Sequence, residues 1–218
     1  PGAYRAYLAP AAVNEITSMF SWNGFSYSAL RKGSSAFLKL AQNEVSLSPL
    51  FSMRENFDLG ITPQFNSVGE ISAEKINMVE NGKLTQMLTS SRSAKEYSVP
   101  GNFAEVNEAP RSLEILPGSL AEDQALKALG TGLYLSHLHY LNWSDLSSAR
   151  FTGMTRYACF WVENGEIVGP IKDMRFDDSM YNVFGSNLEA LTKEQHLETN
   201  SDTYFERQIG GKLLPGAL

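Results

Sequence analysis

Hydrophobic and polar positions alternate with a period of two on both sides of two Asn-Gly pairs. The tetrapeptide VENG stands at residues 79–82 and again at 162–165, each time between two apolar runs. Asn-Gly favours a two-residue type I′ hairpin loop, because both central residues need a positive φ that Gly and Asn adopt at low cost. We therefore predict hairpins over residues 70–89 and 151–171. The repeat leaves open whether the two hairpins descend from one duplicated unit or use the same favourable turn independently.

A period of 3.6 residues predicts a small number of helices. Val13, Ile16 and Phe20 share one face of a helix that begins at Pro10, where the missing N–H of proline costs nothing. A short helix fits residues 34–42. A capping box at Ser119 and a glycine at position 130 delimit a helix over 119–129. Ser179 is placed to begin a further helix over residues 180–188.

The remaining apolar runs predict strands, and together the elements indicate a fold class. Strands are expected at residues 3–8, 45–53, 113–116, 132–143, 204–209 and 213–218, and loops at 54–69, 98–111 and 192–203. The regular alternation of strand and helix that builds a parallel sheet is absent. We predict a single α+β domain over residues 1–218, with a large, mainly antiparallel β-sheet and a few packed helices.

Composition narrows the class of protein. The chain has 218 residues, of which 43% are hydrophobic and 19% charged, so a sizeable core is expected. A net charge of -6 without any run of Lys or Arg disfavours nucleic-acid binding. No apolar stretch approaches the ~18 residues of a membrane span, and no signal peptide is visible. The single cysteine excludes an internal disulfide and fits a reducing compartment such as the cytoplasm. Because the chain starts at Pro1 and stops inside a predicted strand, we expect a fragment of a longer protein.

Three residues are weak candidates for catalysis. His137 and His139 are two apart on a predicted strand, so their side chains point the same way and could bind one metal with a third ligand from elsewhere. No His-Glu-x-x-His motif accompanies them, and ordinary hydrogen-bonded strand residues are the favoured interpretation. Cys159 could be a nucleophile with one of these histidines as base, but a buried structural thiol is favoured. We assign no metal ligand in this chain.

Arg156 is a candidate for binding an anion such as a peptide carboxylate. It ends the segment Thr152-Gly153-Met154-Thr155 that leads into the second hairpin. The chain contains no phosphate-binding loop, dinucleotide fingerprint, nucleophile elbow or Cys-x-x-Cys pair. The residues alone therefore assign no reaction.

A longer pattern resembles a known family. Gly132-Leu133-Tyr134, the TGMTR segment at 152–156, the ENG turn at 163–165 and Pro170-Ile171-Lys172 follow one another between residues 132 and 176. This order resembles the carboxy-terminal domain of the TldD/PmbA family, described as modulators of DNA gyrase and as metallopeptidases that mature peptides. The opening PGAYRAYLAPAAV and the first hairpin extend the resemblance over nearly the whole chain.

The resemblance implies where catalysis resides. Zinc-carrying members of the family hold the metal on a His-Glu-x-x-x-His helix and add a cysteine near the carboxy terminus. These 218 residues contain no such helix motif, and Cys159 falls in a different strand from that ligand. We therefore expect a PmbA-like domain without a metal of its own, with zinc in a partner subunit or in an absent amino-terminal half.

The resemblance also implies a homodimer or a TldD-like partner subunit, and a cleft that admits an extended peptide. A peptide can add to a free strand edge through main-chain hydrogen bonds. Tyr134 and Tyr140 are candidates to line such a groove, with core packing as the alternative. Two functions stay open: a domain of a proteolytic assembly that shapes the interface and the cleft, or a non-catalytic scaffold that binds a peptide or a protein.

Overall fold

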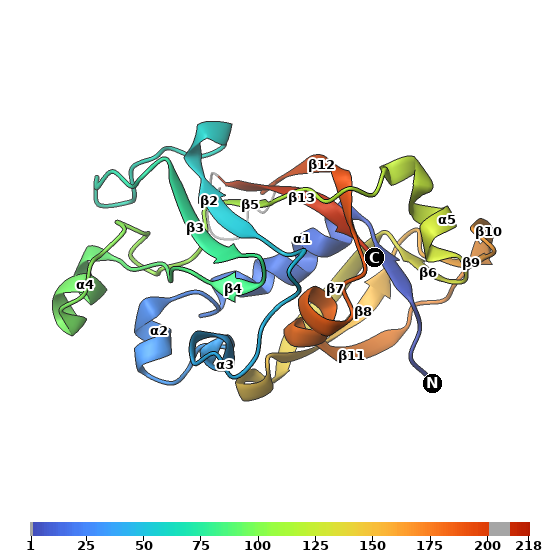
Figure 1. Cartoon of the computed structure of the whole chain (residues 1–218), viewed down its shortest axis with the longest axis horizontal. Coiled ribbons are helices and arrows are strands. Elements are labelled where there is room, and N and C mark those ends of the chain that lie inside the picture. The colour runs from blue at the N-terminus through green and yellow to red at the C-terminus, as the bar shows by residue number, and fades with distance from the viewer. Residues whose placement is uncertain (1, 201–209) are drawn as a thin grey trace.

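Two β-sheets pack around the helix α1 (Figure 1). The computed structural model describes residues 2–200 and 210–218. The strands are β1 Ala6–Leu8, β2 Met53–Asn56, β3 Lys75–Glu80, β4 Lys83–Leu84, β5 Ser112–Ile115, β6 Gly132–Leu135, β7 His137–Asp145, β8 Arg150–Arg156, β9 Phe160–Glu163, β10 Glu166–Pro170, β11 Arg175–Ser179, β12 Leu191–Thr199 and β13 Gly211–Ala217. The α-helices are α1 Pro10–Ser18, α2 Tyr27–Arg31, α3 Leu38–Ala41, α4 Ser91–Tyr97 and α5 Ala125–Leu129. A π-helix covers Asn182–Ser186.

The larger sheet has ten strands and is mainly antiparallel. Nine of its strands follow the order β10-β9-β6-β1-β13-β5-β2-β3-β4, and β12 also pairs with β13. Only two of the described pairs are parallel, β1 with β6 and β13 with β5. The smaller sheet has the order β11-β8-β7 and is antiparallel throughout. The α+β class with a large, mainly antiparallel sheet is confirmed.

The two VENG segments form the hairpins at the two ends of the large sheet. Asn81 and Gly82 have φ of 49° and 77°, and Asn164 and Gly165 have φ of 52° and 82°. Glu80 pairs with Lys83 and Glu163 with Glu166, so each loop has the two residues that a type I′ turn requires. Both predicted hairpin tips are confirmed, and Figure 1 shows β4 and β10 far apart in the molecule.

The chain crosses between the two sheets at two neighbouring places. Residues 132–143 are not one strand as predicted, because β6 belongs to the large sheet and β7 to the small one, with a break at Ser136. The predicted strand 151–162 breaks in the same way between β8 and β9. Tyr157 turns the chain there with a φ of 62°, and the Ser136 hydroxyl donates to the carbonyl of Arg156 at 3.4 Å. Neither crossing carries a Gly, Pro, Asn or Asp turn signal at its break, so the sequence pattern does not reveal the change of sheet.

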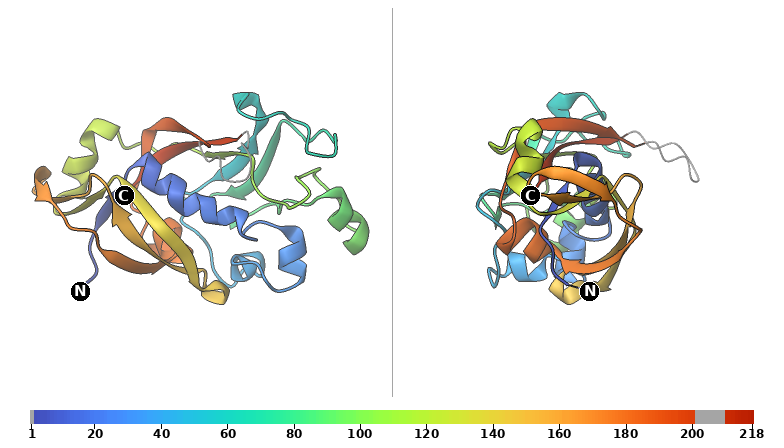
Figure 2. Two further views of the ribbon diagram at one scale, coloured as in Figure 1. Left: turned by 180° about the vertical axis from the view of Figure 1, so that it is seen from behind. Right: turned by 90° about the vertical axis from the view of Figure 1, so that its right-hand side faces the viewer.

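Helix α1 lies between the sheets. It begins at Pro10, as predicted, and continues into a 3₁₀ turn over Met19–Ser21. Its apolar face, with Val13 and Ile16 fully buried, joins the main core. Figures 1 and 2 both show β12 and β13 on one side of α1 and β7 and β8 on the other. The polar face of α1 lies next to β13 and forms part of a surface there.

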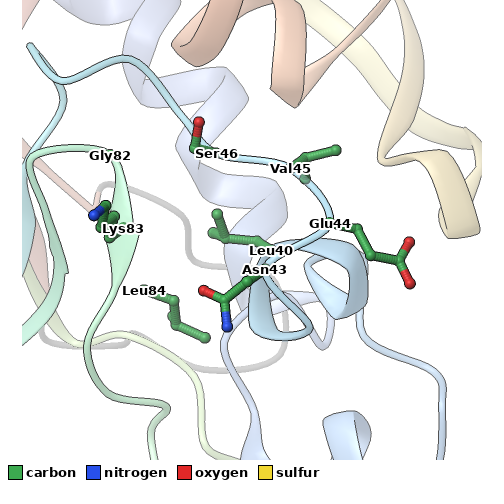
Figure 3. Close-up of a pocket in the computed structure, with 8 residues that line it drawn as sticks. All are labelled: Leu40, Asn43, Glu44, Val45, Ser46, Gly82, Lys83 and Leu84. Atoms are coloured by element: carbon green, nitrogen blue, oxygen red, sulfur yellow. The ribbon is translucent and has the colours of Figure 1, made fainter.

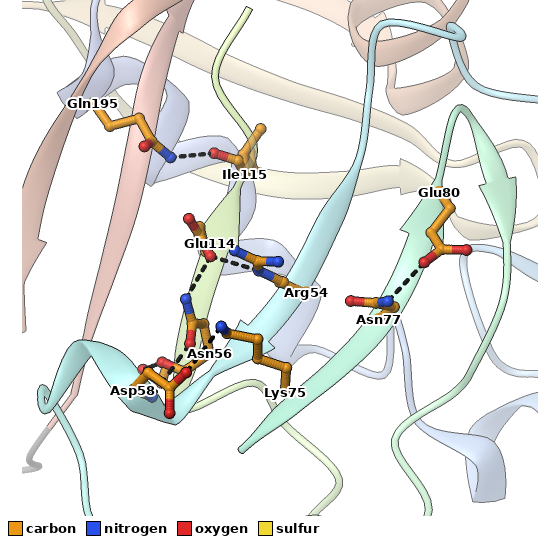
Figure 4. Close-up of polar contacts among 10 residues, drawn as sticks. Arg54, Asn56, Asp58, Lys75, Asn77, Glu80, Glu114, Ile115 and Gln195 are labelled. Atoms are coloured by element: carbon orange, nitrogen blue, oxygen red, sulfur yellow. Dashed lines mark hydrogen bonds and ion pairs between the residues drawn. The ribbon is translucent and has the colours of Figure 1, made fainter. Parts of the chain in front are cut away.

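A polar network fixes the middle of the large sheet (Figure 4). The buried Glu114 carboxylate on β5 accepts from Arg54 Nε at 2.6 Å and from Asn56 Nδ2 at 2.7 Å, both on β2. Gln195 on β12 donates to the carbonyl of Ile115 at 2.7 Å. Lys75 pairs with Asp58 at 2.9 Å near the surface. The Glu114 contacts join β2 to β5, and the Gln195 contact joins β12 to the end of β5.

Several local predictions are wrong. Residues 192–203 are not a loop over their whole length, because β12 runs to Thr199 as a strand whose exposed face explains the polar sequence. Most of 45–53 is irregular, since strand β2 starts only at Met53 and continues into the predicted loop.

The predicted helix 119–129 begins only at Ala125, after a 3₁₀ turn over Glu122–Gln124. Leu120 instead bridges to Thr192 of β12, so Ser119 caps nothing. The predicted stop is confirmed, because Gly130 has a φ of 68°. Helix α4 was not predicted at all. The strand predicted at 204–209 lies outside the described residues.

Helix α5 covers a second, smaller core that includes Tyr7, Leu129 and Val162. No helix in residues 2–200 and 210–218 combines the length and the hydrophobicity that crossing a membrane requires.

Candidate functional site

The polar face of α1 meets a buried lysine from the last strand. Lys212 on β13 donates through Nζ to the carbonyl of Asn14 at 3.0 Å, to Thr17 Oγ1 at 3.3 Å and to Ser18 Oγ at 2.6 Å. These three contacts use the three donors of the ammonium group. Burial lowers the pKa of Lys212 to about 8, although the nearby Glu15 and Glu198 carboxylates oppose that shift. The lysine therefore joins α1 to the large sheet.

A hollow of about 570 Å³ opens beside this lysine. Its wall combines the second half of α1, the ends of β12 and β13, and the segment around Pro110 and Arg111. The residues on which its chemistry depends are Glu15, Ser18, Trp22, Arg111, Glu198 and Lys212. The Trp22 side chain is 48% exposed, so an aromatic surface stands at the edge of the hollow. This volume fits one or two amino-acid side chains of a bound molecule.

Glu15 is the most unusual group of the hollow. Burial raises the pKa of its carboxyl, while the charges of Lys212, His137, Arg156 and His139 act in the opposite direction. Its carboxylate has no hydrogen bond or ion pair with any residue that the structure describes. An unpaired, partly desolvated carboxylate of this kind is typical of functional sites.

Four of the residues singled out in the sequence lie together where the chain crosses between the sheets. His137 on β7 is directly opposite Arg156 on β8, and His139 follows on the same side of the strand. The Cys159 thiol, which is 2% exposed, donates to the carbonyl of Arg156 at 3.2 Å. Both histidines and Arg156 are close enough to act on the pKa of Glu15. Helix α1 contacts β7 on one side and β13 on the other, so it lies between the crossing region and the hollow.

The individual groups differ in what they can do. His137 Nδ1 lies 3.1 Å from Ser136 Oγ, whereas His139 Nε2 is buried without a hydrogen-bond partner. The Arg156 guanidinium lies 4.4 Å from the centre of the Tyr157 ring and is exposed. Because Cys159 is buried and bonded to main-chain carbonyls, its thiol has the surroundings of a structural residue.

The two predicted groove tyrosines occupy different environments. Tyr134 on β6 is half-buried, with ring centres 5.7 Å from Tyr7 and 6.1 Å from Phe160, and burial raises its pKa. Tyr140 lies at a bulge in β7 with a φ of 52° and is 79% exposed. The structure thus brings only Tyr140 to the surface near His139, 4.4 Å between ring centres.

Metal binding has no ligand set in the described part of the chain. Within residues 2–200 and 210–218, no three His, Cys, Asp or Glu side chains are arranged to hold one ion. His137 and His139 share a face of β7 as predicted, but no third ligand joins them. The described residues therefore offer no ligand set that fits a zinc ion.

Sequence reasoning missed Glu15, Trp22, Glu198 and Lys212. The polar positions 14, 15 and 18 recur along α1 between its apolar ones, which is the one local signal of a second functional face. Lys212, which bonds Asn14 and Ser18, is 194 residues further along the chain than Ser18. No pattern within the helix could indicate that contact.

A smaller hollow of about 430 Å³ lies at the first VENG turn (Figure 3). It is lined by α3, the following residues Asn43–Ser46 and the hairpin residues Gly82 to Leu84. Its charged side chains, Glu44 and Lys83, are exposed. Because none of its charged groups is withdrawn from water, we take the hollow beside α1 as the candidate site and this one as a control surface.

Comparison with known proteins gives consistent results. The model of the PmbA/TldA metallopeptidase C-terminal domain matches residues 1–214. The chain is 30% identical over 159 residues to the metalloprotease PmbA of Escherichia coli O157:H7, an alignment that covers 72% of this chain and 32% of that protein.

Solved structures share the fold. A proposed modulator of a DNA gyrase from Thermotoga maritima superposes with a TM-score of 0.79 at 17% identity, covering 99% of this chain and 48% of the other. TldE from Thermococcus kodakarensis gives a TM-score of 0.75 at 16% identity, covering 100% and 49%. This chain thus spans about a third of its curated relative and about half of these solved structures.

Proposed function

This chain belongs to the PmbA/TldD metallopeptidase family as its C-terminal domain, and we propose that it binds an extended peptide for a proteolytic assembly whose zinc chemistry lies on another segment or subunit. The metal that the family name implies finds no ligand set among the described residues. We therefore derive no hydrolytic step in this domain. What the chain's own residues can supply is binding and orientation of a peptide.

The observation that carries this proposal is the hollow beside α1 and its continuity with the crossing region. The hollow offers space for a side chain, and Arg156, which is exposed and whose charge acts on the Glu15 carboxyl, is available as a clamp for a carboxylate. Beyond Lys193, no described residue pairs with the outer edge of β12. A peptide that adds to that edge meets Glu198 and Thr199 at the rim of the hollow. Tyr140 extends the same surface near His139.

Assembly and location are part of the same proposal. We expect the domain to form a homodimer or to pair with a zinc-bearing TldD-like subunit in the cytoplasm. The single free thiol at Cys159 is consistent with a reducing compartment, and a net charge of -6 disfavours a nucleic-acid partner. Analytical ultracentrifugation of the chain, alone and with a zinc-bearing family member, tests the assembly.

Fluorescence anisotropy with labelled, unstructured peptides tests the binding. The unmodified chain is expected to bind these peptides. It should not cleave them when zinc is added, and mass spectrometry of the peptides checks this. Ser21→Trp, which fills the hollow beside α1, should weaken binding by about tenfold, comparable to the loss of a buried contact worth ~1.4 kcal/mol. The matched control is Ser46→Trp, which fills the hollow at the first VENG turn and should leave affinity unchanged.

Mixing the chain with a zinc-bearing family subunit separates the two functions that the sequence left open. Cleavage in the mixture but not with the chain alone supports a domain of a proteolytic assembly. Binding without cleavage in both settings supports the non-catalytic scaffold. Cleavage by the chain alone that disappears in His137→Ala or Cys159→Ala would contradict the proposal and indicate an intrinsic active site.

A further inference from the structure

The cationic groups that line the hollow beside α1 already have partners. The three donors of Lys212 are used by Asn14, Thr17 and Ser18. Arg111 donates through Nη1 to the carbonyls of Pro63 and Phe65, and its guanidinium lies 4.8 Å from the centre of the Phe57 ring. Its Nη2 has no hydrogen-bond partner among the described residues, but that atom is buried and does not reach the open hollow. Neither cation therefore presents a free, accessible donor to an anion that enters the hollow.

The Glu15 and Glu198 carboxylates of the hollow have no partners within residues 2–200 and 210–218. Glu198 on β12 is directly opposite Lys212 on β13, a position in which an ion pair normally forms. The Lys212 ammonium instead turns to α1, and Glu198 has no hydrogen bond or ion pair with a described residue. Glu15 lacks such a contact as well. Among the charged side chains that face the open hollow, the unused hydrogen-bonding capacity is thus of the acceptor type.

Two further features favour a cation at this place. The hollow lies along the second half of α1 and its 3₁₀ extension, where the helix dipole presents its negative end. Trp22 stands exposed at the same end, and the face of an indole ring attracts cations. Four basic groups nearby favour the ionised form of Glu15 and so lower its pKa, namely Lys212, His137, Arg156 and His139. Only Lys212 among them lines the hollow, so the cation belongs on the side of Glu198 and Trp22.

We propose that this hollow binds a primary ammonium group of the peptide, either the amino terminus or a lysine side chain, held by Glu198 with Glu15 and Trp22. This inference rests on the proposed peptide-binding function and adds a chemical preference to it. Three N–H donors of the ammonium group match the unused carboxylate oxygens.

The test compares three ten-residue peptides labelled at the carboxyl end. One has a free amino terminus and no lysine, one is acetylated and has no lysine, and one is acetylated with a single lysine. Anisotropy titrations should show that the acetylated, lysine-free peptide binds about tenfold more weakly than the free one, since it lacks the charged donor that the carboxylates would accept from. Restored affinity of the acetylated lysine peptide assigns the side chain as a source, and its failure to bind tightly assigns the amino terminus.

Two variants distinguish a specific role of Glu198 from a general effect of charge. Glu198→Gln should abolish the preference for the ammonium group and leave the affinity for the acetylated, lysine-free peptide unchanged. Glu166→Gln, on β10 at the far end of the large sheet, removes the same charge and should keep the preference. Equal affinity of all three peptides would overturn the inference while leaving peptide binding intact. Failure of every peptide to bind would overturn both.

Discussion

Two carboxylates beside helices, Glu108 and Glu15, differ in how many hydrogen-bond donors surround them and in the direction in which their pKa is shifted. Glu108 is buried, and its oxygens accept from Ser26 Oγ at 2.6 Å, from the main-chain N–H of Ser28 at 2.8 Å, and from the N–H and hydroxyl of Ser90 at 2.9 Å each. Although burial alone favours the neutral acid, the hydrogen bonds of these serines and of Ser93 hold the pKa of Glu108 below its usual range. Glu15 is half-buried with no such donors, and burial raises its pKa.

The difference between these carboxylates separates a structural role from a binding role. Ser26 and Ser90 are the N-caps of α2 and α4, so one carboxylate joins the first turns of two helices. All the hydrogen-bonding capacity of that site is used within the chain. At Glu15 and Glu198 no described residue uses the carboxylate oxygens, and the proposed ligand would complete their hydrogen bonding. Hydrogen-bond partners, rather than residue type, therefore distinguish the candidate site from the framework.

The largest effect is expected from removing the structural carboxylate. Glu108→Ala leaves several buried donors of Ser26, Ser28 and Ser90 without an acceptor, and should lower the free energy of unfolding by about 3 kcal/mol or more. Glu105→Ala, in the same loop, removes a half-buried carboxylate that accepts from the exposed Ser67 and the main-chain N–H of Val106, and should cost less, about 1 kcal/mol. Urea denaturation followed by circular dichroism measures both. Equal losses would mean that Glu108 has no special role in joining α2 and α4.

A third carboxylate, Glu55, shows that the number and type of hydrogen-bond donors decide whether the pKa of a buried carboxyl rises or falls. It is buried and accepts only from the main-chain N–H groups of Arg111 and Ser112, and burial raises its pKa to about 7 despite these bonds. Its folded pKa exceeds the unfolded value, so the folded protein binds the extra proton between pH 4.5 and 7. This group should therefore reduce stability as the pH rises through that window, by roughly 3 kcal/mol.

Glu55→Gln removes that titration, and the free energy of unfolding should then fall less between pH 4.5 and pH 7 than in the unmodified chain. Glu108 has the opposite sign, because its pKa is lowered on folding and its contribution is lost as the pH falls below the unfolded value. Urea denaturation at a series of pH values separates the two. If the free energy of unfolding of Glu55→Gln depends on pH as it does in the unmodified chain, groups other than Glu55 cause that dependence.

A moderate effect is expected from the cation of the candidate site. Lys212→Met removes three hydrogen bonds to α1, but it also removes the cost of burying a charge. The net loss of stability should be about 1 kcal/mol, within the range for partly compensated buried charges. Lys39→Met on α3 is the matched control, and it should cost under ~0.5 kcal/mol. A loss as large as that of Glu108→Ala would mean that Lys212 is as essential to folding as Glu108.

The sequence predicts the framework better than the site. The hairpin tips at Asn81-Gly82 and Asn164-Gly165 and the start of α1 at Pro10 were predictable because each depends on residues that are adjacent in the chain. The crossings at Ser136 and Tyr157 were not, since a strand leaves one sheet for another without a change in its apolar pattern. The hollow depends on Lys212 meeting α1 from the other end of the chain, and on the absence of partners for Glu15 and Glu198. Contacts between distant segments decide both, and local patterns do not contain them.

The smallest effect on stability is expected at the other carboxylate of the comparison. Glu15→Gln breaks no hydrogen bond among the described residues, so the free energy of unfolding at pH 7 should change by less than ~0.5 kcal/mol. Since burial raises the pKa of Glu15, its ionised form disfavours folding as the pH rises, and any change should be toward higher stability. Urea denaturation at pH 7, beside Glu108→Ala, measures the contrast. A loss for Glu15→Gln that approaches the loss for Glu108→Ala would show that Glu15 has a structural partner after all, and it would remove the distinction between used and unused carboxylates on which the binding role of the hollow depends.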